Sequence, residues 1–171
     1  LATTGAMNFD SADPGNMDAN GILENIIKHE MAHVIGFGTL WQANSLYIAD
    51  TGEYTGSAGL TTYQTEFDSA ATFIPVELDG GAGTANGHWN EEGGLNLTGI
   101  TDTNGNDMRD ELMTGIFYNN GETFLSDTTI ASFQDLGYTV SFPLAVPVPA
   151  SVWLFASALG FLGYSRKNKA A

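Results

Sequence analysis

The clearest hydrophobic pattern lies near the N-terminus, where apolar residues recur every three or four positions over residues 18–35. This spacing predicts a helix, with Asp18 as its cap and Gly36 as its stop. At about 100° per residue, one stripe of this helix contains four residues: Ile22, Ile26, His29 and His33. Only a narrow arc is polar, so we expect a central helix that is buried on most sides.

Three other segments carry weaker signals of regular structure. A short strand is expected at Ala6–Phe9 and a second helix over residues 62–73. A third helix is predicted over residues 126–136, with Ser126 as its N-cap and Gly137 as its stop. Between these segments the chain is rich in glycine and asparagine, which predicts long loops.

Residues 142–171 form a different kind of sequence. They begin with a run that contains three prolines, continue through residues 150–164 without a charge, and end in a basic cluster of Arg166, Lys167 and Lys169. We therefore divide the chain into a globular region, residues 1–141, and a tail, residues 142–171, made of a Pro-rich linker, an apolar helix and a basic end.

Composition limits the chemistry of the globular region. The chain has no cysteine, so any metal must be held by His, Asp or Glu. All 20 acidic residues lie between Asp10 and Asp135, and only Lys28 and Arg109 are basic before residue 150. Such an acidic body repels nucleic acid and anionic lipid, so we expect no nucleic-acid partner. We find no signal-peptide pattern at the start, and we interpret the chain as a fragment or a processed product.

His29, Glu30 and His33 form an H-E-x-x-H pattern on the predicted helix. Residues four apart lie on one helix face, so both imidazoles can reach one ion at about 2.0–2.1 Å. Glu30 points beside that ion, where it can take a proton from a zinc-activated water and deliver it to a leaving amine. The pattern therefore predicts His29 and His33 as metal ligands and Glu30 as the catalytic base.

A hydrolytic zinc site needs a third protein ligand and an open position. His88 is the one remaining histidine, and it lies in a Gly-rich stretch next to Trp89. Three carboxylates compete with it for the role of third ligand: Asp79, Glu91 and Glu92.

Residues 29–41 resemble the active-site segment of the leishmanolysin-like branch of the metzincin zinc peptidases. Most metzincins place the third ligand at the position of Thr39, whereas this branch inserts a long stretch before it, and His88 resembles that displaced ligand. Residues 111–115 resemble the Met-turn of the branch, whose methionine, here Met113, lies beneath the zinc. Residues 126–140 resemble its closing helix and strand.

This resemblance implies an α+β, metzincin-like zincin fold, represented mainly by the active-site helix and the loop-rich C-terminal subdomain. It also implies one catalytic Zn²⁺ held by His29, His33 and His88, and a secreted or surface endopeptidase that hydrolyses polypeptides. About 17 residues precede the predicted helix, so the N-terminal sheet of the fold is largely missing, and the chain is N-terminally truncated relative to the family. The alternative function is a non-catalytic metal-binding module of the cell surface or extracellular matrix.

An acidic loop follows at residues 102–111. It concentrates oxygen ligands that Ca²⁺ prefers: Asp102, Asn104, Asn106, Asp107 and Asp110. The loop lacks the glycine and glutamate positions of an EF-hand, so it is either a candidate calcium loop or an ordinary Asx-rich turn.

The tail resembles the PEP-CTERM sorting signal of Gram-negative bacteria, with Pro147-Val148-Pro149 in place of Pro-Glu-Pro. This resemblance implies export to the cell surface or the extracellular space and processing by an exosortase-type enzyme. The uncharged residues 150–164 are close to membrane-spanning length, and a basic end suits a cytoplasmic flank. We therefore expect the tail to enter the membrane as a transmembrane helix, transiently or permanently.

Overall fold

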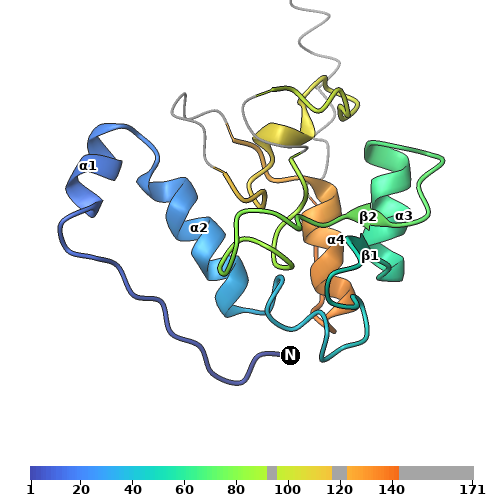
Figure 1. Ribbon diagram of the computed structural model, residues 1–171, viewed down its shortest axis with the longest axis horizontal. Coiled ribbons are helices and arrows are strands. Elements are labelled where there is room, and N and C mark those ends of the chain that lie inside the picture. Colours follow the sequence, from blue (N-terminus) through green and yellow to red (C-terminus); the bar gives the residue numbers. More distant parts are fainter. Residues whose placement is uncertain (92–95, 117–122, 143–171) are drawn as a thin grey trace, which may run out of the picture.

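The computed structural model describes residues 1–91, 96–116 and 123–142. Its helices are α1 (Pro14–Ala19), α2 (Leu23–Val34), α3 (Ser57–Glu66), the short 3₁₀ helix η1 (Met108–Asp110) and α4 (Asp127–Asp135). Two strands, β1 (Glu53–Tyr54) and β2 (Ile74–Pro75), pair antiparallel, with Tyr54 opposite Ile74. The described residues thus form a small α+β fold, as the sequence predicted, in which α2 lies on one side and α3 and α4 lie together on the other (Figure 1).

The helix predicted over residues 18–35 is two helices. Gly21 follows α1 at φ +71°, and its N–H donates to the Asp18 carbonyl while the Ile22 N–H donates to the Met17 carbonyl. These two bonds form a Schellman motif, which ends a helix at a left-handed glycine. Asp18 therefore belongs to α1, and Ile22, whose side chain makes no capping bond, stands at the N-cap of α2.

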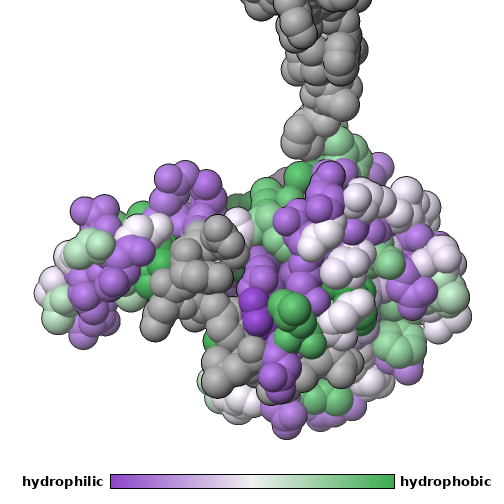
Figure 2. Space-filling model, turned by 90° about the horizontal axis from the view of Figure 1, so that it is seen from above, coloured by the Kyte–Doolittle hydropathy of each residue, from purple (hydrophilic) through white to green (hydrophobic). Residues whose placement is uncertain are grey.

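The prediction that this helix is buried on most sides was wrong. Of the α2 residues only His29 and Ala32 are buried, and Met31 is 50% exposed. In the described part of the chain, α1 contacts one end of α2, and residues 1–13 run past it as a single irregular segment (Figure 1). The α1 region projects from the rounded body (Figure 2), and most residues of α2 are partly or fully exposed.

No strand forms at Ala6–Phe9 or after α4 within residues 137–140, although both were expected. A strand requires a neighbour to pair with its backbone groups, and the one sheet of the described residues consists of β1 and β2.

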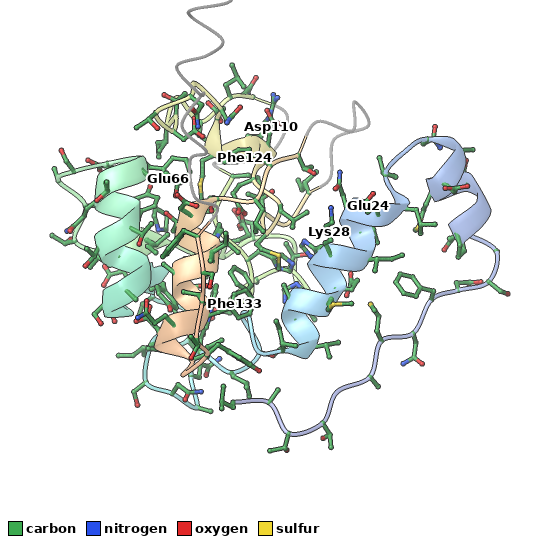
Figure 3. The ribbon with its side chains drawn as sticks, turned by 180° about the vertical axis from the view of Figure 1, so that it is seen from behind. Glu24, Lys28, Glu66, Asp110, Phe124 and Phe133 are labelled. Carbon is green, nitrogen blue, oxygen red and sulfur yellow. The ribbon has the colours of Figure 1, made fainter. Side chains whose placement is uncertain are left out.

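Helices α3 and α4 are antiparallel, and the N-terminus of each helix is capped by a carboxylate from the C-terminal end of the other. Asp135, the last residue of α4, accepts the N–H groups of Ala58 and Gly59 at 2.8 and 2.9 Å. Glu66, the last residue of α3, accepts the N–H groups of Asp127 and Thr128 at 3.0 and 2.8 Å (Figure 3). Negative groups at helix N-termini satisfy unpaired N–H groups and complement the helix dipole.

This arrangement explains why one of these two helices was predicted more accurately than the other. Ser126 caps α4 by accepting the Thr129 N–H at 3.0 Å, and Gly137 ends the region at φ +95°, both as predicted. The predicted helix over residues 62–73 overlaps only the second half of α3, whose first turn is stabilised by Asp135 from a distant part of the chain. After Phe67 the chain turns, with Asp68 accepting the Ala70 N–H.

A cluster of buried aromatic side chains connects the two sides of the molecule. The Trp41 and Trp89 rings stack at 4.9 Å, and Phe37 and Tyr54 pack edge-on against Trp89 at 5.0 and 5.3 Å. All four side chains are fully buried. Since Phe37 directly follows the α2 region and Trp89 follows His88, this cluster fixes two segments that carry histidines.

Within the described residues, no helix has the length and apolar character needed to cross a membrane. The proposed transmembrane helix at residues 150–164 lies outside the described residues, as does nearly all of the predicted tail.

Candidate metal centre

Helix α2 brings His29 and His33 onto one face, one turn apart, as their spacing predicted. His88 approaches them from the loop that follows β2. The three Nε2 atoms form a nearly equilateral triangle: 3.1 Å between His29 and His33, and 3.0 Å from each of these to His88. Among the described residues, this is the one group of His, Asp and Glu side chains whose ligand atoms converge closely enough to hold a metal ion.

Each of the three imidazoles is oriented by a backbone carbonyl. The Nδ1 atoms of His29, His33 and His88 lie 2.7, 3.0 and 2.8 Å from the carbonyl oxygens of residues 112, 37 and 84. A carbonyl only accepts hydrogen bonds, so these contacts assign the proton of each neutral ring to Nδ1. The three Nε2 lone pairs then point at one another.

Three lone pairs at this separation repel unless an electrophile lies between them, so the donor set itself fits a metal ion. In a tetrahedral zinc site with Zn–N distances of about 2.0–2.1 Å, the nitrogens are about 3.3 Å apart, close to the 3.0–3.1 Å seen here. A hydrogen bond from the second ring nitrogen to a carbonyl is also the usual support of a metal-binding histidine.

Burial keeps two of these rings neutral. It lowers the pKa of His29 to about 4, against a smaller opposing effect of the hydrogen bond to Leu112, and the neighbouring His33 lowers it further. Burial likewise lowers the pKa of His88 to about 4, opposed by the Thr84 carbonyl and assisted by the other two histidines. Neutral imidazole is the form that binds metal, so these two rings are ready to bind at neutral pH.

The backbone around His88 is fixed from both sides. The Glu77 N–H donates to the His88 carbonyl at 2.9 Å, and the Trp89 N–H donates to the Met113 carbonyl at 3.0 Å. The residue before it, Gly87, lies directly against Gly38, the second residue after Gly36. Gly38 has φ +68°, and a Cβ placed on it would lie 2.4 Å from the Gly87 carbonyl oxygen, so only glycine allows this approach.

An open cleft of about 430 Å³ lies next to the triangle. Glu30, His33 and His88 all line it, together with Thr39 and glycines of both neighbouring loops. Glu30 is exposed, as a group that exchanges protons with a substrate and with water must be. The cleft therefore brings the predicted base and the outer side of the histidine group to one surface.

Met113 belongs to the buried core. Its side chain is fully buried, and the preceding residue, Leu112, supplies the carbonyl that orients His29. The role of Met113 as the apolar floor of a Met-turn stays a prediction.

The competing carboxylates do not join the histidines in the described residues. Glu91 is buried and accepts the Gly115 N–H at 3.1 Å, and Asp79 lines a separate cavity of about 330 Å³. Burial raises the pKa of Glu91, and the nearby Glu77 raises it further. Glu92 lies outside the described residues.

The structure gives no support to the calcium site. Asp102 accepts the N–H groups of Asn104 and Asn106, both at 2.8 Å, and Asp107 accepts those of Thr98, Gly99 and Arg109. Partial burial would raise the pKa of Asp102 and Asp107, but the hydrogen bonds outweigh it and lower both.

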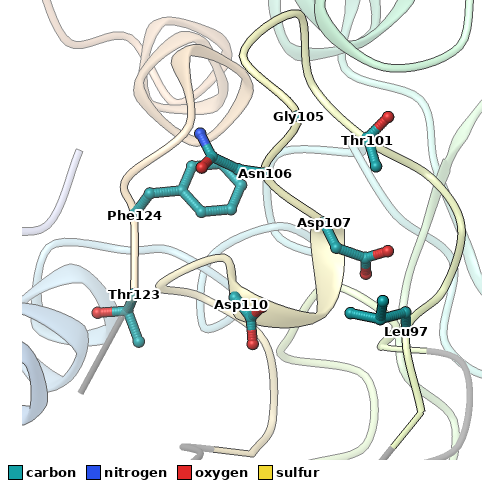
Figure 4. A pocket seen from close by; sticks show the side chains of 8 residues that line it. All are labelled: Leu97, Thr101, Gly105, Asn106, Asp107, Asp110, Thr123 and Phe124. Atoms are coloured by element: carbon teal, nitrogen blue, oxygen red, sulfur yellow. The ribbon is translucent and has the colours of Figure 1, made fainter. Parts of the chain in front are cut away.

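Asp110 pairs with Arg109 at 2.9 Å. A cavity of about 620 Å³ adjoins this loop (Figure 4), but the described carboxylates of the loop are used in Asx-type turns and an ion pair rather than gathered around one point.

Sequence reasoning missed the groups that orient the histidines. The carbonyls of Phe37, Thr84 and Leu112 carry no signal in the sequence, because every residue has a carbonyl. Glu111, a fully buried carboxylate beside Leu112, was predicted only as part of the acidic loop and of the Met-turn. Its position directly before two apolar residues is the sequence signal that could have indicated its burial.

Comparison with protein families gives one match: the peptidase family model described as leishmanolysin matches residues 2–153. Comparisons with curated proteins and with solved structures gave no match.

Proposed function

Since this chain belongs to the leishmanolysin family of peptidases, we propose that it is a zinc-dependent endopeptidase of polypeptides. In this proposal His29, His33 and His88 hold one zinc ion, Glu30 is the catalytic base, and Met113 is the apolar floor of the site. The observation that carries it is the convergence of three carbonyl-oriented imidazoles, with Nε2 atoms 3.0–3.1 Å apart, beside an open cleft.

The chemistry divides between the metal and the chain. Zinc, when bound, acts as a Lewis acid that polarises a carbonyl and makes water more acidic. The imidazoles of His29 and His88 stay neutral down to a pH of about 4 and remain available as ligands. The Glu30 carboxylate takes the proton of the attacking water and passes it to the nitrogen of the leaving amine.

Two substitutions test this proposal separately. Glu30→Gln removes the base but none of the three ligands, so zinc content should stay at one per chain while casein hydrolysis falls by about 10²–10⁴-fold. His88→Ala removes one ligand and should lower zinc content and activity together. Zinc content is measured by elemental analysis after dialysis. Unchanged hydrolysis by Glu30→Gln would refute its role, and unchanged zinc affinity in His88→Ala would transfer the third ligand to a carboxylate.

A second candidate function is a non-catalytic metal-binding module of the cell surface or matrix. It is favoured by one observation: within the described residues no strand at Ala6–Phe9 borders the cleft. If the chain is such a module, it should bind one zinc ion, and the wild type and Glu30→Gln should show the same level of casein hydrolysis.

We also propose that the protein is exported by a Gram-negative bacterium and that its tail is a sorting signal for an exosortase-type enzyme. The support is sequence alone: Pro147 and Pro149, the uncharged residues 150–164 and the basic end. Mass spectrometry of protein from the producing cell tests it. A mature C-terminus near residue 150 agrees with sorting, an intact Ala171 in the membrane fraction agrees with anchoring, and an intact Ala171 in a soluble secreted product refutes both.

A further inference from the structure

We infer that Glu111 is a positioning residue of the metal site, which holds the turn at residues 111–113 so that the Leu112 carbonyl orients His29. The inference rests on the proposed function, because it takes His29 as a metal ligand.

Glu111 is buried without a cation. Its side chain is 1% exposed, and neither of the ion pairs formed among the described residues includes it. Taking a carboxylate out of water is costly unless hydrogen bonds replace the lost solvent. Burial accordingly raises the pKa of Glu111, although the surrounding donors oppose it. The hydrogen bonds made by its two oxygens should therefore explain why a carboxylate is buried at this position.

The two oxygens hold two different parts of the chain together. One accepts the Met113 N–H at 2.5 Å, which closes the turn. The other accepts the N–H and hydroxyl of Ser126 at 3.0 and 2.8 Å and the Thr129 hydroxyl at 2.7 Å. The carboxylate therefore ties the turn to the N-terminus of α4.

This turn touches both segments that carry the histidines, α2 and the loop at His88. The Leu112 carbonyl contacts His29 Nδ1 at 2.7 Å. The Met113 carbonyl accepts the N–H of Trp89, the neighbour of His88, at 3.0 Å. A shift of the turn would therefore move the partner of His29 and the backbone next to His88 at the same time.

Glutamine cannot replace this carboxylate. Its amide has one oxygen and one NH₂ group, whereas both positions of the Glu111 carboxylate face donors. In either orientation the NH₂ group would face another donor, at Met113 or at the start of α4. We expect the turn to shift in Glu111→Gln and the orientation of His29 to be lost.

Glu66→Gln is a matched control. Glu66 also accepts several bonds at the N-terminus of α4, from the N–H of Asp127 and from the N–H and hydroxyl of Thr128. Both substitutions weaken the same helix end, but only Glu111 bonds the turn beside the histidines. A loss that comes from lower stability alone would appear in both variants.

The experiment measures zinc affinity by competition with a chelator, and the visible absorption spectrum of the Co²⁺-loaded protein, for the full chain and both variants. Loss of a hydrogen bond that supports a metal ligand costs about 10–100-fold in affinity. We expect such a loss and a changed Co²⁺ spectrum in Glu111→Gln, and less than about a threefold change in Glu66→Gln. If Glu111→Gln does not fold, Glu111→Asp decides by the same measurements, because its carboxylate is one methylene too short to bridge both partners.

The outcomes separate this inference from the proposed function. Zinc binding by the wild type together with unchanged affinity and spectrum in the Glu111 variant overturns this inference alone. Equal losses in the Glu66 and Glu111 variants overturn it as well. A wild-type chain that binds no zinc overturns the proposed function, and this inference falls with it.

Discussion

Lowering the pH from 7 to 5 should cost His29 and His88 almost none of their affinity for zinc. Protons compete with zinc for imidazole nitrogen, so the affinity of a histidine site falls once its rings become protonated. Burial, partly opposed by the bonds to carbonyls, lowers the pKa of both rings to about 4. Because the shift is downward, the neutral form persists below the pH at which an exposed histidine would become charged.

The expected magnitude follows from these values. An imidazole with the ordinary pKa of about 6.5 is about 24% protonated at pH 7 and about 97% protonated at pH 5, so this change weakens zinc binding about 25-fold. A ring with a pKa of about 4 is about one-tenth protonated at pH 5, which weakens binding only about 1.1-fold. Two ordinary rings would thus cost about 600-fold between pH 7 and pH 5, and the two buried rings about 1.2-fold.

The assay is a chelator competition at several pH values, corrected for protonation of the chelator, with circular dichroism to verify folding at pH 5. A synthetic peptide of residues 23–34 provides the control, because it contains His29 and His33 without the fold that buries them. The peptide should lose affinity steeply over this interval. A loss of about 600-fold or more in the folded protein between pH 7 and pH 5 would refute the reasoning, since at least two rings would then titrate normally.

Three further predictions concern the scaffold. Gly38→Ala should destabilise the fold by about 1–3 kcal/mol in urea denaturation, because its Cβ would lie against the Gly87 carbonyl, and zinc affinity should fall with it. Gly15→Ala, in helix α1 with open space around it, should lower neither stability nor zinc affinity. Ser126→Ala should cost about 1–2 kcal/mol, because it removes both the N-cap of α4 and the hydroxyl that donates to Glu111; a change under about 0.3 kcal/mol would argue against both bonds. Asp135→Asn should cost about 1–3 kcal/mol in thermal unfolding, and an unchanged transition would mean that solvent replaces its bonds.

The part of the site that depends on local spacing could be predicted from the sequence. His29 and His33 share a face because they are four residues apart in a helix, and Glu30 is turned beside them for the same reason. The N-cap at Ser126 is also local, since it bonds the N–H of Thr129, three residues on. His88 was found through its scarcity and the family resemblance, because nothing local to residue 88 indicates that it meets α2.

The remaining features depend on contacts between distant residues or on signals that were overlooked. The first turn of α3 is held by Asp135, 77 residues from Ala58 in the chain, so no local pattern predicted where the helix begins. The break between α1 and α2 did have a local signal, the Asn20-Gly21 pair, which the long apolar periodicity concealed. The second ring nitrogens of the histidines are held by carbonyls, which sequence patterns do not distinguish.

The reciprocal capping of α3 and α4 by Asp135 and Glu66 couples the unfolding of these two helices. Glu66 and Asp135 each stand at the C-terminus of their own helix, where a negative charge opposes the helix dipole, and at the N-terminus of the partner, where it is favourable. Helices of 10 and 9 residues are also too short to persist alone in water.

Neither helix is therefore an independent unit, and the pair should form and melt in one cooperative step. In hydrogen exchange, the amides at the starts of the two helices should open with one common free energy. Because the N-terminus of α4 also holds the turn beside His29 through Glu111, that shared opening would set how long a bound metal stays in place.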